Sequence, residues 1–222
     1  MRVLRPPSGP AATLDSQRRR LLDELRTQGI KDERVLGAIA KVPREQFIEE
    51  ALRSRAYENN ALPIGQAQTI SQPYVVALMT QAILAGKQKL ARVLEIGTGC
   101  GYQTAVLAEL VPAVFTIERL KRLSEQARER LARLHYHKIH FSYSDGNAGW
   151  PTYAPFDAIL VTAAAEKIPQ PLIDQLAPGG RLVIPVGPLG FQNLKQVERG
   201  DKGVRTTDLC GVSFVPLLSG RA

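Results

Sequence analysis

Apolar positions along the chain follow two spacings, one typical of buried strands and one typical of helices. Between the strand-like runs, segments such as 119–134 place leucine or alanine at every third or fourth position. The alternation of strand-like and helical segments along the chain predicts a mostly parallel, doubly wound α/β sheet. The strand-like runs stand at 93–96, 114–117, 139–143, 156–162 and 181–186.

The N-terminal part of the chain has no strand pattern. Apolar residues at helical spacing in 16–28, 32–42 and 47–52 predict helices, which we expect to pack as an appendage (residues 15–58) on the α/β core. Residues 1–14 contain several prolines and are expected to form a flexible tail.

The C-terminal part alternates polar and apolar residues in 193–199 and 204–209, on either side of a glycine-containing turn. This pattern predicts an antiparallel hairpin. We therefore expect one domain over residues 15–222, built on a seven-stranded, Rossmann-like sheet whose last strands are antiparallel.

Glycines occupy alternate positions directly after the first strand-like run. Gly97, Gly99 and Gly101 follow the strand, and helical spacing resumes after them. A strand, a glycine turn and a helix open a nucleotide-type site, because glycine lets the backbone turn sharply and approach a ligand closely. Tyr102 stands where a dinucleotide fingerprint has its last glycine, and the Walker Lys–Ser/Thr ending is absent, so no phosphate cradle is expected.

Two acids accompany this turn. Glu95 lies on the strand before it, and Glu118 ends the next strand, roughly 20 positions beyond the first glycine, where an acid can bind ribose hydroxyls. Either acid alone is equally well explained as a surface or helix-end residue. Together with the glycine spacing they favour a cationic ligand, and S-adenosylmethionine, a sulfonium with an ammonium group and a ribose, fits. Asp145 and Gly146 end a later strand and are placed to border the adenine end.

A loop rich in amides and hydroxyls, residues 59–73, carries little charge and leads into a helix with Pro73 in its first turn. Such a loop offers free N–H groups and hydroxyls to a carboxylate. Ser71 or Gln72 stands at the cap of this helix, and for Ser71 a cap role is compatible with ligand binding.

Composition excludes several other classes of protein. No apolar stretch approaches membrane-spanning length, and the N-terminus lacks the apolar core of a signal peptide, so a cytoplasmic location without membrane contact is expected. The net charge of +8 permits nucleic-acid binding, but basic residues mostly alternate with acids, as at Arg128, Glu129 and Arg130, which solvated helix faces explain equally well.

Neither the cysteines nor the histidines predict a metal site. Cys100 and Cys210 are far apart in the sequence. His135, His137 and His140 have no carboxylate or cysteine beside them, so a surface turn is the better interpretation.

Four segments, in this order, resemble the protein-L-isoaspartate O-methyltransferase family, particularly its bacterial form. One of them, the glycine turn, resembles class I methyltransferases in general. The resemblance extends from about residue 17 to the Phe214–Leu217 segment. The four segments are Leu62–Pro73, Glu95–Thr104, Pro155–Ala164 and Pro178–Gly187.

This resemblance implies methyl transfer from S-adenosylmethionine, which leaves S-adenosylhomocysteine, to the free carboxylate of L-isoaspartyl residues in damaged proteins and peptides. The ester closes to a succinimide, whose hydrolysis returns some normal aspartate. The resemblance also implies that Ser71 is the active-site residue and that Thr69 and Ile70 shape its pocket. The family's cofactor positions correspond to Glu95, Gly97, Thr98, Gly99, Cys100, Gly101, Glu118, Asp145 and Gly146.

The implied chemistry agrees with the residues. A carboxylate is ionised at neutral pH, so as a methyl acceptor it needs no general base, only desolvation and alignment. Ser71 would position it, and a peptide backbone could pair with an edge near Val212–Val215.

Two alternatives remain: a nucleic-acid methyltransferase and a non-catalytic cofactor-binding protein. The residues after the fourth strand, Thr162–Ala165, lack the Asp/Asn-Pro-Pro-aromatic turn of amine methylation, and the complete acceptor loop disfavours a non-catalytic role. No exposed apolar helix is evident, so a monomer that acts on isoaspartyl proteins and not on nucleic acid is expected.

Overall fold

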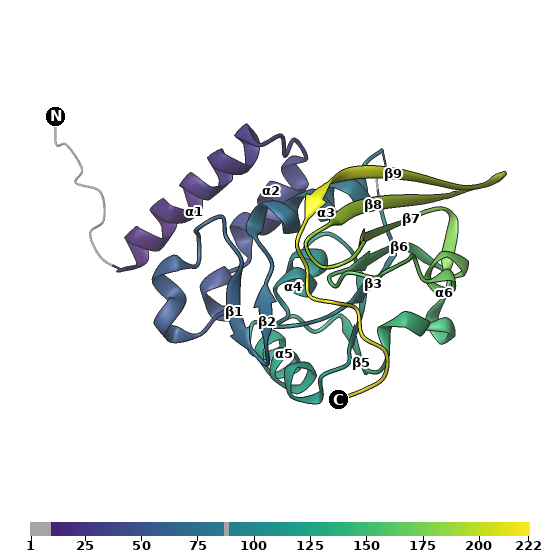
Figure 1. Cartoon of the computed structure of the whole chain (residues 1–222). Coiled ribbons are helices and arrows are strands. Elements are labelled where there is room, and N and C mark those ends of the chain that lie inside the picture. The colour runs from purple at the N-terminus through teal and green to yellow at the C-terminus, as the bar shows by residue number, and fades with distance from the viewer. Residues whose placement is uncertain (1–9, 87–88) are drawn as a thin grey trace.

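The computed structural model describes residues 10–86 and 89–222 of the chain. Within these ranges, one seven-stranded sheet has the order β5-β4-β3-β6-β7-β8-β9 (Figure 1). The neighbouring strands β5, β4, β3, β6 and β7 run parallel to one another. Strands β8 and β9 are added antiparallel at the β7 edge. The strands are β3 (Arg92–Ile96), β4 (Ala113–Glu118), β5 (Ile139–Tyr143), β6 (Phe156–Val161), β7 (Leu176–Val186), β8 (Gln192–Gly200) and β9 (Gly203–Val212).

Helices cover both faces of the sheet, so that its central strands are buried on both sides. Alternate residues of β3 show this: Val93 packs with the N-terminal helices and α4, whereas Leu94 and Ile96 pack with α6. The helices are α1 (Pro10–Thr27), α2 (Glu33–Lys41), α3 (Pro73–Leu84), α4 (Tyr102–Ala108), α5 (Lys121–Arg133) and α6 (Gln170–Asp174), with 3₁₀ turns at η1 (Arg44–Phe47), η2 (Glu50–Arg55), η3 (Gly146–Ala148) and η4 (Pro151–Tyr153). The predicted fold class is confirmed.

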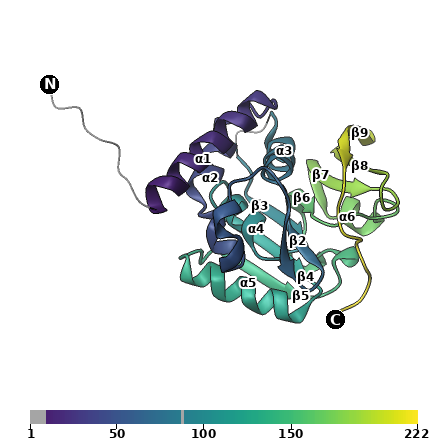
Figure 2. The ribbon, with the colours of Figure 1, turned by 60° about the vertical axis from the view of Figure 1, so that its left-hand side comes forward.

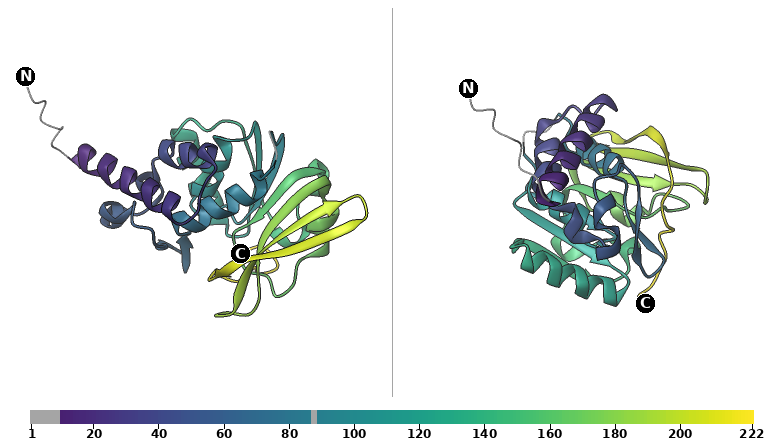
Figure 3. Two further views of the ribbon diagram at one scale, coloured as in Figure 1. Left: turned by 90° about the horizontal axis from the view of Figure 1, so that it is seen from above. Right: turned by 90° about the vertical axis from the view of Figure 1, so that its left-hand side faces the viewer.

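The N-terminal helices and the C-terminal hairpin lie on opposite sides of the molecule (Figures 2 and 3). The far end of the β8–β9 hairpin projects away from the sheet, while the end of β9 returns toward β2 and α3 (Figure 1). The carboxyl ends of β3, β4 and β6 are bordered by residues 60–76, which follow the N-terminal helices, and by residues 190–218.

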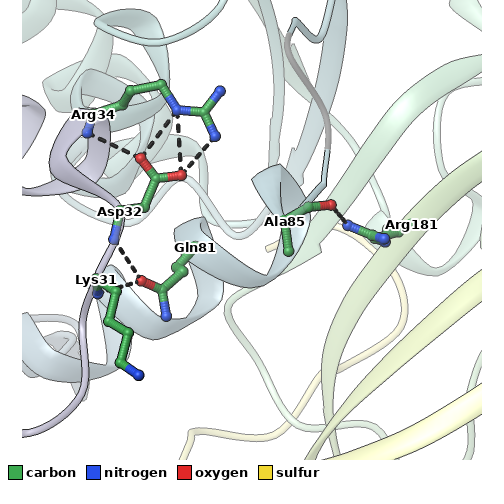
Figure 4. Close-up of polar contacts among 6 residues, drawn as sticks. All are labelled: Lys31, Asp32, Arg34, Gln81, Ala85 and Arg181. Atoms are coloured by element: carbon green, nitrogen blue, oxygen red, sulfur yellow. Dashed lines mark hydrogen bonds and ion pairs between the residues drawn. The ribbon is translucent and has the colours of Figure 1, made fainter.

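Hydrogen bonds fasten the N-terminal helices to the core (Figure 4). Oε1 of Gln81, on α3, accepts from the backbone N–H groups of Lys31 (2.7 Å) and Asp32 (2.9 Å), and Asp32 in turn caps α2. At the same C-terminal end of α3, Arg181 of β7 donates to the carbonyl of Ala85, the residue that caps the helix. Helix α3 thus bonds both the start of α2 and strand β7 of the sheet.

Four local expectations need correction. Helix α1 begins at Pro10, so the expected tail is helical over 10–14, and its remainder lies outside the described residues. The expected helix over 47–52 is instead the pair of 3₁₀ turns η1 and η2. Between and after these turns the chain folds around the buried side chain of Arg44, which donates to the carbonyls of Ala56, just after η2, and of Ser71.

The polar loop 59–73 contains an antiparallel hairpin, β1 (Leu62–Gly65) and β2 (Gln68–Ile70), which its alternating small and polar residues did not predict. Strand β7 begins at Leu176, before the Pro178–Gly180 stretch that was expected only to end a helix. The pairing with β6 shifts register there, so the strand accommodates the proline and glycines as an irregularity.

Candidate functional site

A cavity of about 890 Å³ opens at the carboxyl ends of β3, β4 and β6. This is where an open α/β sheet binds ligands, and the size suits a small-molecule cofactor. Its wall combines the glycine turn, the β1–β2 hairpin and the segment after β9. The cavity is lined by ten of the predicted site residues: Thr69, Ile70, Ser71, Gly97, Thr98, Gly99, Cys100, Glu118, Gly146 and Val212.

Gly97 allows β3 and β6 to approach closely at the cavity floor. Its φ is +94°, and a Cβ there would lie 2.3 Å from Oγ1 of Thr162. That hydroxyl donates to the carbonyl of Gly97 at 2.7 Å, and the carbonyl oxygen of Ile96 is a second acceptor at 3.1 Å. Any side chain at position 97 would therefore break this contact and force a strained backbone.

Glu118 is buried at the end of β4 and faces the glycine turn. Its Oε2 accepts the N–H of Gly99 at 2.9 Å, and its Oε1 accepts the N–H of Leu120 at 2.9 Å. Each carboxylate oxygen can accept more than one hydrogen bond. The carboxylate thus supports the loop and can still accept from ligand hydroxyls in the cavity it lines.

Glu95 does not line the cavity, contrary to the expectation that it faces the ligand directly. It is fully buried on the face of β3 covered by α4, where Oε2 accepts hydroxyl hydrogen bonds from Thr104 (2.5 Å) and Thr116 (2.7 Å). Burial raises the pKa of Glu95 to about 8. The side chain of Thr98, which lines the cavity, bonds Thr116 at 2.6 Å and so connects to Glu95 through one hydroxyl.

Gly101 and Asp145 also lie outside the lining. A Cβ on Gly101 would lie 2.9 Å from Leu131, so this glycine lets α4 begin close to α5. Asp145 accepts from the N–H groups of Asn147 (2.8 Å) and Gly220 (2.7 Å), and these bonds lower the pKa of its carboxyl despite partial burial. A direct cofactor contact for Asp145 stays a prediction, whereas its neighbour Gly146 lines the cavity.

The other end of the cavity is formed by the β1–β2 hairpin and the chain leading into α3. Thr69, Ile70 and Ser71 line it, and Gln72, not Ser71, occupies the helix-cap position, without a side-chain bond. The Ser71 hydroxyl is therefore not used as a cap. The Ser71 carbonyl accepts from Nη2 of Arg44 at 2.9 Å, which fixes the backbone of this segment.

The segment after β9 borders the cavity together with the β1–β2 hairpin, and we call this part of the cavity the acceptor end. Fewer backbone N–H and carbonyl groups of the segment are free than expected. The N–H and carbonyl of Phe214 are both bonded to the Gln192 side chain, at 2.6 and 3.0 Å. Val215 and Leu217 bond Ala164 through their backbone. Any pairing with a substrate peptide is therefore displaced from Phe214 toward Val212 and Ser213.

Sequence reasoning missed two large apolar residues that line the cavity. Phe191 and Leu218 line the cavity while they are 83% and 49% exposed, and neighbouring Leu189 is 80% exposed. Large apolar side chains standing free beside a binding site indicate an apolar contact with a partner. Gly187 and Gly190, both with positive φ, stand in the turn just before Phe191, and the sequence offers no other signal for that residue.

The described residues show no group of three or more His, Cys, Asp or Glu side chains arranged to hold a metal ion. In the same part of the chain, no helix combines the length and apolar character needed to cross a membrane.

A doubly wound sheet with a glycine turn, a ribose-type acid and an uncharged acceptor hairpin defines a class I methyltransferase. S-adenosylmethionine fits these residues, because the backbone of Gly97 to Gly99 leaves room for close approach and Glu118 can accept from its hydroxyls.

Comparison with known proteins specifies the family. The family model described as protein-L-isoaspartate(D-aspartate) O-methyltransferase matches residues 16–222. A protein-L-isoaspartate O-methyltransferase of Halorhodospira halophila is 52% identical over 217 residues, with 98% of each chain covered. Another, of Shewanella halifaxensis, is 58% identical over 192 residues, which cover 86% of this chain and 90% of the relative. The chain belongs to the protein-L-isoaspartate(D-aspartate) O-methyltransferase family.

Solved structures agree. A protein-L-isoaspartate O-methyltransferase superposes with a TM-score of 0.81 at 28% identity, over 90% of this chain and 65% of that one. A Plasmodium falciparum protein with the same family description, in complex with S-adenosyl-L-homocysteine, gives 0.79 at 27% identity, over 90% and 98%.

Proposed function

We propose that this protein transfers a methyl group from S-adenosylmethionine to the free carboxylate of L-isoaspartyl residues in damaged proteins and peptides, which starts their repair through a succinimide. The observation that carries the proposal is that the glycine turn with Glu118 and the uncharged hairpin end with Ser71 line one cavity. Family membership and close relatives of the same description support it.

S-adenosylmethionine supplies the methyl group, and the protein binds and orients both reactants. An acceptor carboxylate oxygen forms the new bond to the methyl carbon while the methyl–sulfur bond breaks, and that electron pair stays on sulfur. No proton moves in this step, because the acceptor is already ionised. Ser71, whose carbonyl accepts from Arg44, therefore needs no histidine or carboxylate beside its hydroxyl for this step.

Ser71 has the role of a positioning donor: its hydroxyl holds the acceptor carboxylate at the end of the cavity. Thr69, Ile70 and Val212 shape the same pocket. Alignment of an ionised acceptor with the methyl carbon, away from water, supplies the rate enhancement. The exposed apolar side chains of Phe191 and Leu218 are suited to contact the chain that carries the isoaspartyl residue.

The assay that tests this function offers labelled S-adenosylmethionine together with an isoaspartyl peptide, its aspartyl twin or RNA. Base-labile label on the isoaspartyl peptide alone is the expected result. Label on RNA would favour the nucleic-acid alternative that the charge of +8 leaves open, and label on none would favour a non-catalytic protein.

The chain is further proposed to act as a cytoplasmic monomer on protein substrates, without binding nucleic acid or membranes. Sedimentation at micromolar concentration tests whether the protein is a monomer, and fractionation of cells tests whether it is cytoplasmic.

A further inference from the structure

Arg44 is a buried cation without a carboxylate partner. Its exposed fraction is 0%, and within residues 10–86 and 89–222 it forms no ion pair. Nη1 has no hydrogen-bond partner there either. Buried charges are normally paired, because an unpaired charge in a low-dielectric interior is costly. The cost of burying Arg44 without an ion pair therefore calls for a functional explanation.

Of the three carbonyls to which Arg44 donates, those of Ser71 and Asn60 belong to residues that line the cavity. Nη2 donates to the carbonyl of Ser71 at 2.9 Å, and Nε donates to the carbonyl of Ala56 at 2.9 Å. The guanidinium also lies over the ring of Tyr102, 4.7 Å from its centroid. Ser71 and Tyr102 both line the cavity, so the charge stands directly behind its wall.

The adjacent acid does not neutralise this charge. Glu45 accepts the hydroxyl hydrogen of Tyr57 at 2.5 Å and lies 3.9 Å from Arg18. Backbone carbonyls provide dipoles but no net charge for Arg44. The positive potential at this end of the cavity is therefore available to an anionic ligand.

We propose that Arg44 is a positioning residue whose buried charge, held against the Ser71 carbonyl and the Tyr102 ring, makes the acceptor end select a carboxylate over a neutral group of the same shape. This inference rests on the proposed function, since it takes the isoaspartyl carboxylate as the acceptor. It adds a source of selectivity that does not touch the substrate.

The chemistry of the transfer gives this role a kinetic signature. The acceptor is negative when it binds, and its charge disappears as the ester forms. A fixed cation nearby therefore stabilises the bound acceptor more than the transition state. Removal of the charge should raise KM for the isoaspartyl peptide without lowering kcat, whereas general damage to the site lowers kcat.

The binding test compares two peptides that differ only in an isoaspartyl carboxylate or the corresponding carboxamide, titrated into protein saturated with S-adenosylhomocysteine. Wild type is expected to bind the carboxylate peptide at least ~10-fold more tightly than the carboxamide peptide. The reason is the attraction between the carboxylate and the guanidinium of Arg44, which are separated only by the residues that line the cavity. Arg44→Gln, which keeps a donor without charge, should lose most of this ratio. Arg44→Lys, which keeps the charge, should retain it.

Arg18→Gln is the matched control, because the charge of Arg18 already faces Glu45 and it should leave the ratio unchanged. Equal binding of both peptides by wild type would overturn the inference even if neither Arg44 variant folds. A full ratio in Arg44→Gln, or a fall in kcat with KM unchanged, would also overturn it. Absence of turnover of the isoaspartyl peptide by wild type would instead refute the proposed function.

Discussion

Glu118 holds the glycine turn directly, since its Oε2 accepts the N–H of Gly99 at 2.9 Å. The acid that ends β4 thereby sets the position of the turn that follows the neighbouring strand β3. One carboxylate thus fixes the glycine turn and also lines the cavity.

Glu118→Gln should weaken S-adenosylhomocysteine binding at least ~10-fold, because a neutral amide is a weaker acceptor for Gly99 and for ligand hydroxyls. Isothermal titration measures the Kd. Glu125→Gln, an exposed site on α5, is the control and should leave the Kd unchanged. Equal affinities for wild type and Glu118→Gln would contradict the assignment of Glu118 to the cofactor.

Gly97→Ala should lower the free energy of unfolding by ~3 kcal/mol or more, because it adds a clash with Thr162 to the cost of a positive φ. Gly29→Ala is a close control: its φ is +99°, and its Cβ would meet nothing within 4 Å. That variant should lose only about 1 kcal/mol. Urea unfolding of both variants checks the difference, and similar losses would show that the contact with Thr162 is unimportant.

Glu95 makes the folded state bind a proton that the unfolded chain releases. Its pKa is about 8 in the fold against an ordinary value of 4.5. Stability from this group is fully present below pH 4.5 and is lost as pH rises through about 8, by at most ~5 kcal/mol. Glu95→Gln should remove that decline, so its stability relative to wild type should be greater at pH 8.5 than at pH 5.5. Parallel urea-unfolding profiles for the two proteins across this range would refute the assignment.

Ser71→Ala should reduce kcat ~100-fold, the size of effect seen when one positioned donor is lost, and should leave the Kd for S-adenosylhomocysteine unchanged. Ser142→Ala on β5, away from the cavity, controls for loss of a hydroxyl. If Ser71→Ala lost cofactor binding and turnover equally, Ser71 would not be the residue that positions the acceptor.

Phe191→Ser should raise KM roughly tenfold for isoaspartyl peptides with apolar neighbours, which corresponds to ~1.4 kcal/mol of lost contact. Peptides with only polar neighbours should be affected less. Val204→Ser removes an exposed apolar side chain from β9 outside the cavity and should leave KM unchanged for both sets of peptides. Steady-state kinetics with the two peptide sets decides, and an equal effect on both sets would show that Phe191 makes no such contact.

The cofactor half of the site was the more predictable half. The unit from Val93 to Thr104 combines a buried apolar run with glycines, and both features report local geometry. Glu118 was predictable for the same reason, since parallel strands bring their ends together. The placement of Glu95 was not predictable, because neither spacing nor composition shows that two threonines, from β4 and α4, close over its side chain.

The acceptor half depends on contacts between distant parts of the chain. Arg44 follows a proline in a polar stretch, which is typical of a solvated residue, and it is buried only because carbonyls at 56 and 71 converge on it. Phe191 is conspicuous only once the turn between β7 and β8 is known to border the cavity. Such properties arise from the tertiary structure and leave no periodic signal.

The methyl-donor end of the cavity is built mainly from residues 96–146, whereas its acceptor end needs both 60–76 and 190–218. During synthesis the donor end is therefore complete in sequence well before the acceptor end. A nascent or truncated copy that lacks β8 and β9 has the residues to hold its donor but no place to deliver the methyl group. On the proposed function, the order of the chain therefore places the residues that complete the acceptor end last.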